Sequence, residues 1–348
     1  MQLWPSLSQA ASTFQLQFFS NTSRPAFHLR ILTFNIRYAT DSPFTNEKPW
    51  AERVPRVLNQ IQHETRFTDG TSTAPGSPPQ HSAASIICLQ EVLHSQLIDL
   101  LNSLNELPSS NDQLADGPIW AHVGVGRDDG HQKGEYSPIL YPVIVFKLIH
   151  TETIWLSPTP EKPSLGWDAG SIRLLTIAVL EHRVTGRRIL ASTTHLDNEG
   201  SKSREHSVSI ILDSLKRVAK DWSTEDVLPV FLAGDFNSFP TQEAYLDMAK
   251  SEYVYDLRDS VPEGRRYGED ITFTGFQKEK WSDEQGRIDF IWLGPGDAVC
   301  KHDHGVKEEV EGSCQWIVDG YTVLPNVFDD GVYLSDHRCV VGDVRLLN

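Results

Sequence analysis

Long hydrophobic runs are missing from this sequence of 348 residues. A helix needs about 20 predominantly apolar residues to cross a bilayer, and no stretch of the sequence approaches that length. Residues 1–20 also lack a basic segment followed by a compact apolar one, which is the pattern of a secretory signal peptide. We therefore expect no membrane anchor and favour a cytoplasmic location.

Cysteine is scarce, with four in the whole chain. None has the C-x-x-C spacing typical of a zinc site. Cys88 and Cys339 lie in apolar runs, where a small buried side chain is the usual interpretation. The sequence leaves open whether Cys300 and Cys314 pair. Glycine-rich loops of the G-x-G-x-x-G or Walker type are also missing, which argues against the common nucleotide-binding folds.

Positive charge is in deficit: 31 Lys and Arg stand against 47 Asp and Glu, for a net charge of -16. Proteins that bind duplex DNA along its backbone usually carry a basic surface, because neutralising phosphates drives most of the affinity. We therefore expect duplex DNA not to be the substrate. An acidic chain suits a site in which carboxylates hold metal cations and the cations meet a phosphate.

What is present is the composition of an ordinary globular protein, with 39% hydrophobic and 22% charged residues. Strand-like apolar runs occur at residues 29–34, 85–89, 136–147, 172–182, 187–194, 227–233, 288–293 and 339–346. Helical spacing occurs at 51–63, 92–104 and 201–222, with a short helix starting near Thr241. Residues 65–82 are rich in Gly, Ser, Thr and Pro and predict an exposed flexible insertion. This mixed order favours an α+β layered fold over a doubly wound sheet.

Several polar residues come just after the ends of apolar strands: Asn35, Glu91, His195, Asp235 and Asn237. Each alone is more often a loop or capping residue, but strand ends gather at one edge of a sheet. Asp235 and Asn237 are two residues apart and so point in the same direction. A carboxylate and an amide paired in this way can orient a water and donate to a phosphoryl oxygen. The alternative is a strand followed by a turn with an Asx-type cap.

Six segments complete the pattern: TFNIR, CLQE, TTHLD, GDFNS, RIDFI and SDH. In order and approximate spacing they resemble the endonuclease/exonuclease/phosphatase superfamily, from Asn35 to His337. The resemblance implies an N-terminal extension (residues 1–27) and one domain (residues 28–348), in place of the two domains that the length allows. It also implies a four-layer α/β/β/α sandwich with two packed mixed, largely antiparallel sheets.

The resemblance further implies the roles of the acidic residues. Glu91 looks like the principal metal ligand, supported by Asn35 and Asp336, and oxygen ligands of this kind suit Mg²⁺ or Mn²⁺. Asp235 resembles the acid that orients the attacking water or accepts its proton. Asn237 resembles the donor to the phosphate in the transition state.

Two histidines resemble the family's catalytic pair. His337 is similar to the catalytic histidine, with Asp289 fixing its tautomer and favouring its charged form. His195 is similar to the second histidine of the deoxyribonuclease branch. The segment GEYSPILY resembles the strand in which that branch places a glutamate against this histidine, which makes Glu135 its expected partner. A solvated acid opening a strand is an equal alternative for Glu135.

Four loop residues are candidates for substrate binding. Arg37, Arg53 and Arg173 would clamp a phosphate, and Trp167 would stack on a base or sugar. The alternatives are rim packing for the tryptophan and surface ion pairs for the arginines. This sequence lacks the motifs that are typical of the inositol 5-phosphatase, sphingomyelinase and abasic-endonuclease branches.

We therefore expect a monomeric metal-dependent hydrolase acting on a small or single-stranded phosphate ester. The alternative is a non-catalytic binding or scaffold protein on the same fold, and the complete set of acids and histidines favours the enzyme. The sequence leaves open which ester is hydrolysed and whether it is a monoester or a diester. It also leaves open whether one or two metal ions take part.

Overall fold

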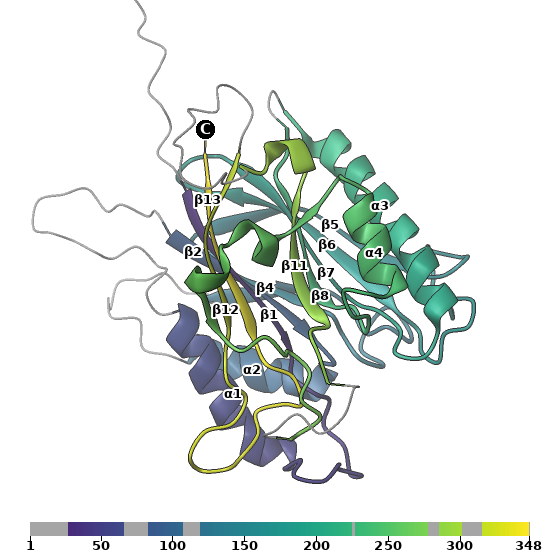
Figure 1. The fold of residues 1–348 in the computed structure, drawn as a ribbon, viewed down its shortest axis with the longest axis vertical. Coiled ribbons are helices and arrows are strands. Elements are labelled where there is room, and N and C mark those ends of the chain that lie inside the picture. Colours follow the sequence, from purple (N-terminus) through teal and green to yellow (C-terminus); the bar gives the residue numbers. More distant parts are fainter. Residues whose placement is uncertain are drawn as a thin grey trace, which may run out of the picture.

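The computed structural model describes residues 27–65, 83–106, 119–224, 227–277, 285–300 and 315–347. Two β-sheets lie at its centre, with α1 and α2 on one side and α3 and α4 on the other (Figure 1). Residues 1–26 of the expected N-terminal extension, residues 66–82 of the expected insertion, and Cys314 lie outside the described residues, so those predictions remain as they were.

The first sheet has seven strands in the order β10-β12-β13-β1-β2-β4-β3. These are β10 (Arg266–Gly268), β12 (Trp316–Val323), β13 (Val340–Leu346), β1 (Phe27–Asn35), β2 (Ala83–Gln90), β4 (Ile139–Pro142) and β3 (Trp120–Val123). The β1–β2 and β10–β12 pairs are parallel and the other pairs antiparallel. Helices α1 (Trp50–Thr65) and α2 (His94–Asn105) cover its outer face through apolar side chains such as Val57 and Leu97.

The second sheet has six strands in the order β5-β6-β7-β8-β11-β9. These are β5 (Phe146–Trp155), β6 (Leu174–His182), β7 (Arg188–His195), β8 (Val230–Asp235), β11 (Asp289–Gly294) and β9 (Tyr255–Asp256). Only β7 and β8 are parallel. Helices α3 (Ser201–Trp222) and α4 (Glu243–Lys250) pack on its outer face. Three short 3-10 turns complete the described elements: η1 (Leu257–Ser260), η2 (Glu263–Arg265) and η3 (Gly296–Ala298).

The core between the sheets is formed by inward-facing residues of both, among them Ile31 and Ile86 from the first sheet and Ala191, Phe231 and Ile291 from the second. Side chains alternate along each strand, so each sheet also buries its other face under helices. The predicted four-layer α/β/β/α sandwich with mixed, largely antiparallel sheets is confirmed.

Strand register brings the candidate residues to one edge of the sandwich. Asn35 pairs with Gln90, so the ends of β1 and β2 coincide and Glu91 follows directly. In the second sheet His195 pairs with Asp235, and Asp235 pairs with Asp289. Asp289, at the start of β11, therefore lies beside Asp235 at the end of β8, and Asp235 lies beside His195 at the end of β7.

The predicted helices occur, and α3 has the predicted bounds. The single strand expected at residues 136–147 is wrong, because a turn at 143–145 separates β4 from β5. The strands β3, β9, β10 and β12 were not predicted. Among the described residues, no helix is long and apolar enough to span a membrane.

Candidate active site

Three residues at this edge have left-handed backbone angles that are uncommon outside glycine: Arg37 (φ 57°), Glu91 (φ 57°) and Asn237 (φ 46°). Such conformations carry strain, and they concentrate at functional sites, where the surrounding structure enforces them. Here each one lies one or two residues after the end of a strand, where the chain turns at this edge.

Asn35 joins the two sheets. Its Nδ2 donates to Glu91 Oε1 and to Asp235 Oδ2, both at 2.9 Å, while its Oδ1 accepts from the backbone N–H of Arg37 at 3.0 Å. In this structure the amide nitrogen bridges two carboxylates, and the amide oxygen keeps one further lone pair. The role of Asn35 as a metal ligand stays a prediction.

Glu91 remains an ionised acid. Burial raises the pKa of its carboxyl group, but Arg37, Asn35 and His337 together outweigh burial and lower it. Arg37 Nη1 lies 3.5 Å from Glu91 Oε2, and the backbone N–H of Tyr38 donates to the same oxygen at 3.3 Å. Arg37 therefore lies at this edge, where Glu47 also pairs with its guanidinium at 3.3 Å, and its contact with a substrate phosphate stays a prediction.

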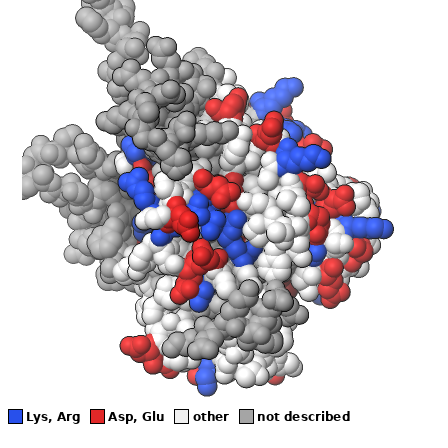
Figure 2. Space-filling model, viewed as in Figure 1, with Lys and Arg blue, Asp and Glu red and all other residues white. Residues whose placement is uncertain are grey.

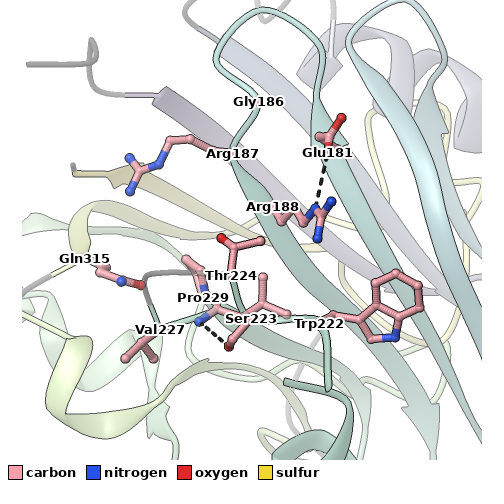
Figure 3. Close-up of a pocket in the computed structure, with 11 residues that line it drawn as sticks. Glu181, Gly186, Arg187, Arg188, Trp222, Ser223, Thr224, Val227, Pro229 and Gln315 are labelled. Atoms are coloured by element: carbon pink, nitrogen blue, oxygen red, sulfur yellow. Dashed lines mark hydrogen bonds and ion pairs between the residues drawn. The ribbon is translucent and has the colours of Figure 1, made fainter. Parts of the chain in front are cut away.

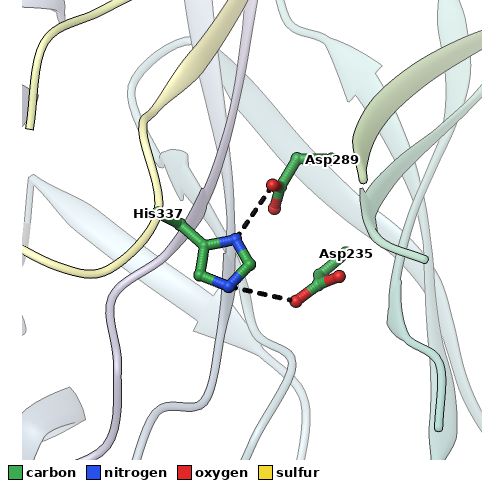
Figure 4. A group of neighbouring side chains, drawn as sticks. All are labelled: Asp235, Asp289 and His337. Atoms are coloured by element: carbon green, nitrogen blue, oxygen red, sulfur yellow. Dashed lines mark hydrogen bonds and ion pairs between the residues drawn. The ribbon is translucent and has the colours of Figure 1, made fainter. Parts of the chain in front are cut away.

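His337 lies between two acids (Figure 4). Its Nδ1 is 2.9 Å from Asp289 Oδ2 and its Nε2 is 3.6 Å from Asp235 Oδ2. Burial lowers the pKa of the imidazole, but the charges of Asp289 and Asp235 outweigh it and raise the pKa to about 10. The structure thus brings together the predicted His337–Asp289 pair, with the ring in its charged form.

Asp235, Asp289 and His337 each offer a ligand atom within 4.8 Å of the others, so the group has the spacing of a metal site. A metal on His337 would have to displace its proton. Asp289 Oδ1 is buried without a partner. The arrangement can therefore act as a hydrogen-bonded acid–base group or hold an ion.

The carboxyl groups of Asp235 and Asp336 have the environment that suits a hard cation. Burial raises the pKa of Asp235 to about 7, and His337 only partly offsets this. Burial and the charge of Glu91 also raise the pKa of Asp336, whose Oδ1 lies 3.1 Å from Ser335 Oγ. Carboxylates that resist ionisation because of burial and mutual repulsion are what a bound divalent cation would stabilise.

His195 is the neutral histidine of the site. Burial lowers the pKa of its imidazole well below the usual value, and the charges of Arg173 and Arg127 lower it further. Its Nε2 is 3.0 Å from Asn237 Nδ2 and 3.5 Å from Asp235 Oδ2. Asn237 Nδ2 also donates to Leu196 O at 3.0 Å, so donating to a phosphate oxygen would require one of these contacts to be given up.

Glu135 lies beside His195 but is not bonded to it. Its Oε2 is 3.8 Å from His195 Nδ1, outside hydrogen-bonding distance, and its carboxylate binds Arg127 at 2.8 Å instead. Burial and the charge of Glu91 raise the pKa of Glu135 to about 7. The alternative of a solvated acid is wrong, because the side chain is largely buried.

Arg53 requires a correction. The side chain is fully buried and donates to four backbone carbonyls, of Lys48, Ile36, Leu334 and Arg37, at 2.7–3.0 Å. The guanidinium N–H groups of Arg53 already donate to the loops behind the site, so this side chain is not available to bind a substrate phosphate.

The other two predicted substrate-binding residues differ in position. Arg173 is buried next to His195 and is held by Asp197 Oδ2 at 3.4 Å and Asn198 Oδ1 at 2.8 Å. Trp167 is 41% exposed and stacks on His206, with 4.2 Å between ring centroids. No hydrogen bond or ring contact in the described part of the chain joins Trp167 to the acids and histidines of the site.

Two residues that the sequence reasoning missed support the site. Arg127 holds Glu135, and Asp197 accepts four backbone N–H groups around Arg173. Signals for both were present: Arg127 lies in a glycine-rich segment before Glu135, and Asp197 ends the TTHLD segment.

A separate hollow lies at the opposite end of β7 and β8 (Figure 3). It is lined by Trp222, Arg187 and Arg188, and Arg188 pairs with Glu181 at 3.1 Å. On the face in Figure 2, acidic and basic side chains are interspersed over the described surface, without one extended basic area.

Comparisons with known proteins agree with this geometry. The pattern that defines the Endonuclease/Exonuclease/phosphatase family matches residues 32–337. Among curated proteins, no match was found. A family protein of known structure from Bacteroides vulgatus is 28% identical, covers 92% of this chain and 99% of its own, and superposes with a TM-score of 0.70.

Two further structures are similar. A mannosyl-6-phosphatase from Bacteroides thetaiotaomicron is 25% identical, covers 91% of this chain and 99% of its own, and has a TM-score of 0.69. The catalytic domain of human Nocturnin is 19% identical with a TM-score of 0.55, covers 92% of this chain and 94% of its own, and shows the fold alone. With the family pattern matched from the middle of β1 to the histidine that precedes β13, this chain belongs to the Endonuclease/Exonuclease/phosphatase family.

Proposed function

We propose that this protein is a divalent-metal-dependent hydrolase of phosphate esters. The observation that carries the proposal is the convergence on one oxygen: Asp235 Oδ2 is contacted by Asn35 and lies within 3.6 Å of both catalytic-type histidines. A buried carboxyl group with a pKa of about 7 is suited to orienting a water and accepting its proton near neutral pH.

Glu91 and Asp336 would hold Mg²⁺ or Mn²⁺, with Asn35 beside them. When bound, the cation supplies a Lewis acid that draws charge from a phosphoryl oxygen. The charged ring of His337 stabilises the negative charge that builds up on the phosphate as water attacks, and Asp289 keeps that ring oriented and protonated. Arg173 lies on the side of His195, and Asn237 would donate to the phosphate on giving up its contact with His195 or Leu196.

We propose a small or single-stranded phosphate ester as the substrate, and a monomer as the working form. The acidic net charge disfavours duplex DNA. The similarity to a mannosyl-6-phosphatase supports trying sugar phosphates first.

A substrate panel with Mg²⁺ or Mn²⁺ tests the proposal. It should set p-nitrophenyl phosphate against the bis-p-nitrophenyl diester, followed by sugar phosphates, nucleotides, inositol phosphates, short RNA and single-stranded DNA. We expect metal-stimulated hydrolysis of at least one member. Hydrolysis of none, by a protein that also binds no metal, would overturn the proposal and favour a non-catalytic binding protein.

A further inference from the structure

The two ring nitrogens of His195 have different environments. Asn237 Nδ2 donates to the carbonyl of Leu196 at 3.0 Å, which fixes the amide with its nitrogen toward His195. The same nitrogen lies 3.0 Å from His195 Nε2. An amide nitrogen can only donate, so Nε2 is the acceptor and the proton of the neutral ring lies on Nδ1.

The Nδ1 proton has no partner. Nδ1 is buried without a hydrogen bond, and an unpaired buried donor is unfavourable. Its neighbour on that side is Glu135 Oε2 at 3.8 Å. A shift of about 1 Å would form the bond, and catalytic hydrogen bonds that are long in a free enzyme commonly shorten when substrate binds.

The position of Glu135 is set by Arg127. Nη1 of Arg127 lies 2.8 Å from Oε2 and Nη2 lies 2.8 Å from Oε1, a two-point contact that fixes the carboxylate plane. The backbone N–H of Arg127 donates to Glu135 O at 3.0 Å, and Trp155 Nε1 donates to Arg127 O at 2.9 Å. Arginine and glutamate are therefore joined through both side chain and main chain, and the pair is anchored to β5.

We propose that Arg127 is a positioning residue of the active site: it holds Glu135 as the acceptor for the Nδ1 proton of His195. The ring then keeps Nε2 free of a proton and available as the acceptor for Asn237 Nδ2. The activity readout of this inference rests on the proposed function, whereas the tautomer of His195 can be measured without any substrate.

The first test is the tautomer. In the metal-free full-length protein at a fixed neutral pH, ¹⁵N-labelled histidine spectra should show the His195 proton on Nδ1. In Arg127→Met the Glu135 carboxylate is no longer held 3.8 Å from Nδ1, and Asp235 Oδ2, 3.5 Å from Nε2, then competes for the ring proton. We therefore expect a mixture of Nδ1–H and Nε2–H forms, with Arg127→Lys in between. A matched control is Arg345→Met, since Arg345 also makes a two-point contact with a carboxylate, through Nε and Nη2 to Asp319 (2.7 and 2.8 Å), on the surface. An unchanged tautomer in Arg127→Met would overturn the proposal.

The second test is a double-mutant cycle on the substrate found in the panel. Arg127→Met should lower kcat by about 10- to 100-fold with a smaller change in KM, as expected for loss of an orienting partner. In the Glu135→Ala background the same substitution should have little further effect, because Arg127 acts through Glu135. Additive losses, or a loss confined to KM, would instead assign Arg127 to substrate binding and contradict the proposal. If the wild-type protein hydrolyses nothing, the proposed function fails and the tautomer test still decides the role of Arg127.

Discussion

Asp235 is the residue on which the site depends most. It ends β8, its Oδ1 accepts the backbone N–H of Asn237 at 2.8 Å, and its Oδ2 faces Asn35, His195 and His337. Three of these groups, the Asn237 N–H, Asn35 and the charged His337, attract and orient the carboxylate. Under the proposed function, a side chain held in this way would be in place before a substrate arrives, which lowers the cost of reaching the transition state.

Replacing Asp235 by Asn tests this role. The amide is nearly isosteric and can still accept from the Asn237 N–H, but it cannot accept a proton from water. We expect kcat/KM to fall by about 100-fold or more, the usual range for loss of a general base. Asp319→Asn, on the exposed face of β12, is the control that should keep wild-type activity. Activity of Asp235→Asn within a few-fold of wild type would show that another group activates the water.

At the same scale, the sequence identified residues at strand ends but not the direction of their hydrogen bonds. The orientation of the Asn35 amide depends on Glu91, Asp235 and the Arg37 N–H, and Asp235 is 200 positions away from Asn35 in the sequence. From the sequence, Arg53 is assigned to substrate binding because the hydrogen-bond partners of its guanidinium are not visible there. Its partners Ile36 O and Leu334 O are backbone atoms that only the fold brings within reach.

At the scale of elements, Asp197 connects the loop after β7 to the segment before β6. Its carboxylate accepts from Gly170, Ser171, Glu199 and Gly200 at 2.7–3.1 Å. Burial raises the pKa of Asp197, but these N–H groups and Arg173 outweigh burial and lower it. The loop that carries Arg173 is therefore fixed by one acid.

Asp197→Ala should lower the free energy of unfolding by about 3 kcal/mol, because one buried and three partly buried N–H groups lose their acceptor. The folded-state pKa is lowered, so this stabilisation is complete above the unfolded-state pKa near 4 and is lost as pH falls through the folded-state value. Urea unfolding at pH 7 and pH 3 should thus show a difference from wild type that shrinks in acid. An equal difference at both pH values would mean that ionised Asp197 is not what holds the loops.

Elements with strong local patterns were predicted, and those that depend on neighbours were not. The apolar stripe of α3 defines its bounds without any tertiary information. Strand β3 has only four residues and exists through its pairing with β4. Strand β12 is held by β13 on one side and β10 on the other. Whether a segment forms a strand depends largely on its packing against such neighbouring strands.

At the scale of the whole molecule, the residues alone predicted only an α+β layered fold, and the four-layer sandwich followed from the resemblance of six short segments to a known family. Composition alone allowed one domain or two. The substrate could not be predicted, since the contacts of loop residues such as Trp167 depend on neighbours that the sequence does not encode locally. Binding specificity in proteins commonly resides in such loops.

The central claim is that phosphate-ester hydrolysis depends on a divalent cation held beside Glu91. The direct measurement is the rate of p-nitrophenyl ester hydrolysis after EDTA treatment and after readdition of Mg²⁺ or Mn²⁺, for wild type, Glu91→Gln and the surface control Asp319→Asn. We predict that EDTA abolishes activity, that the cation restores it in wild type and in the control, and that Glu91→Gln is not restored at the same cation concentration. Activity that survives EDTA, or that Glu91→Gln retains in full, would contradict the account.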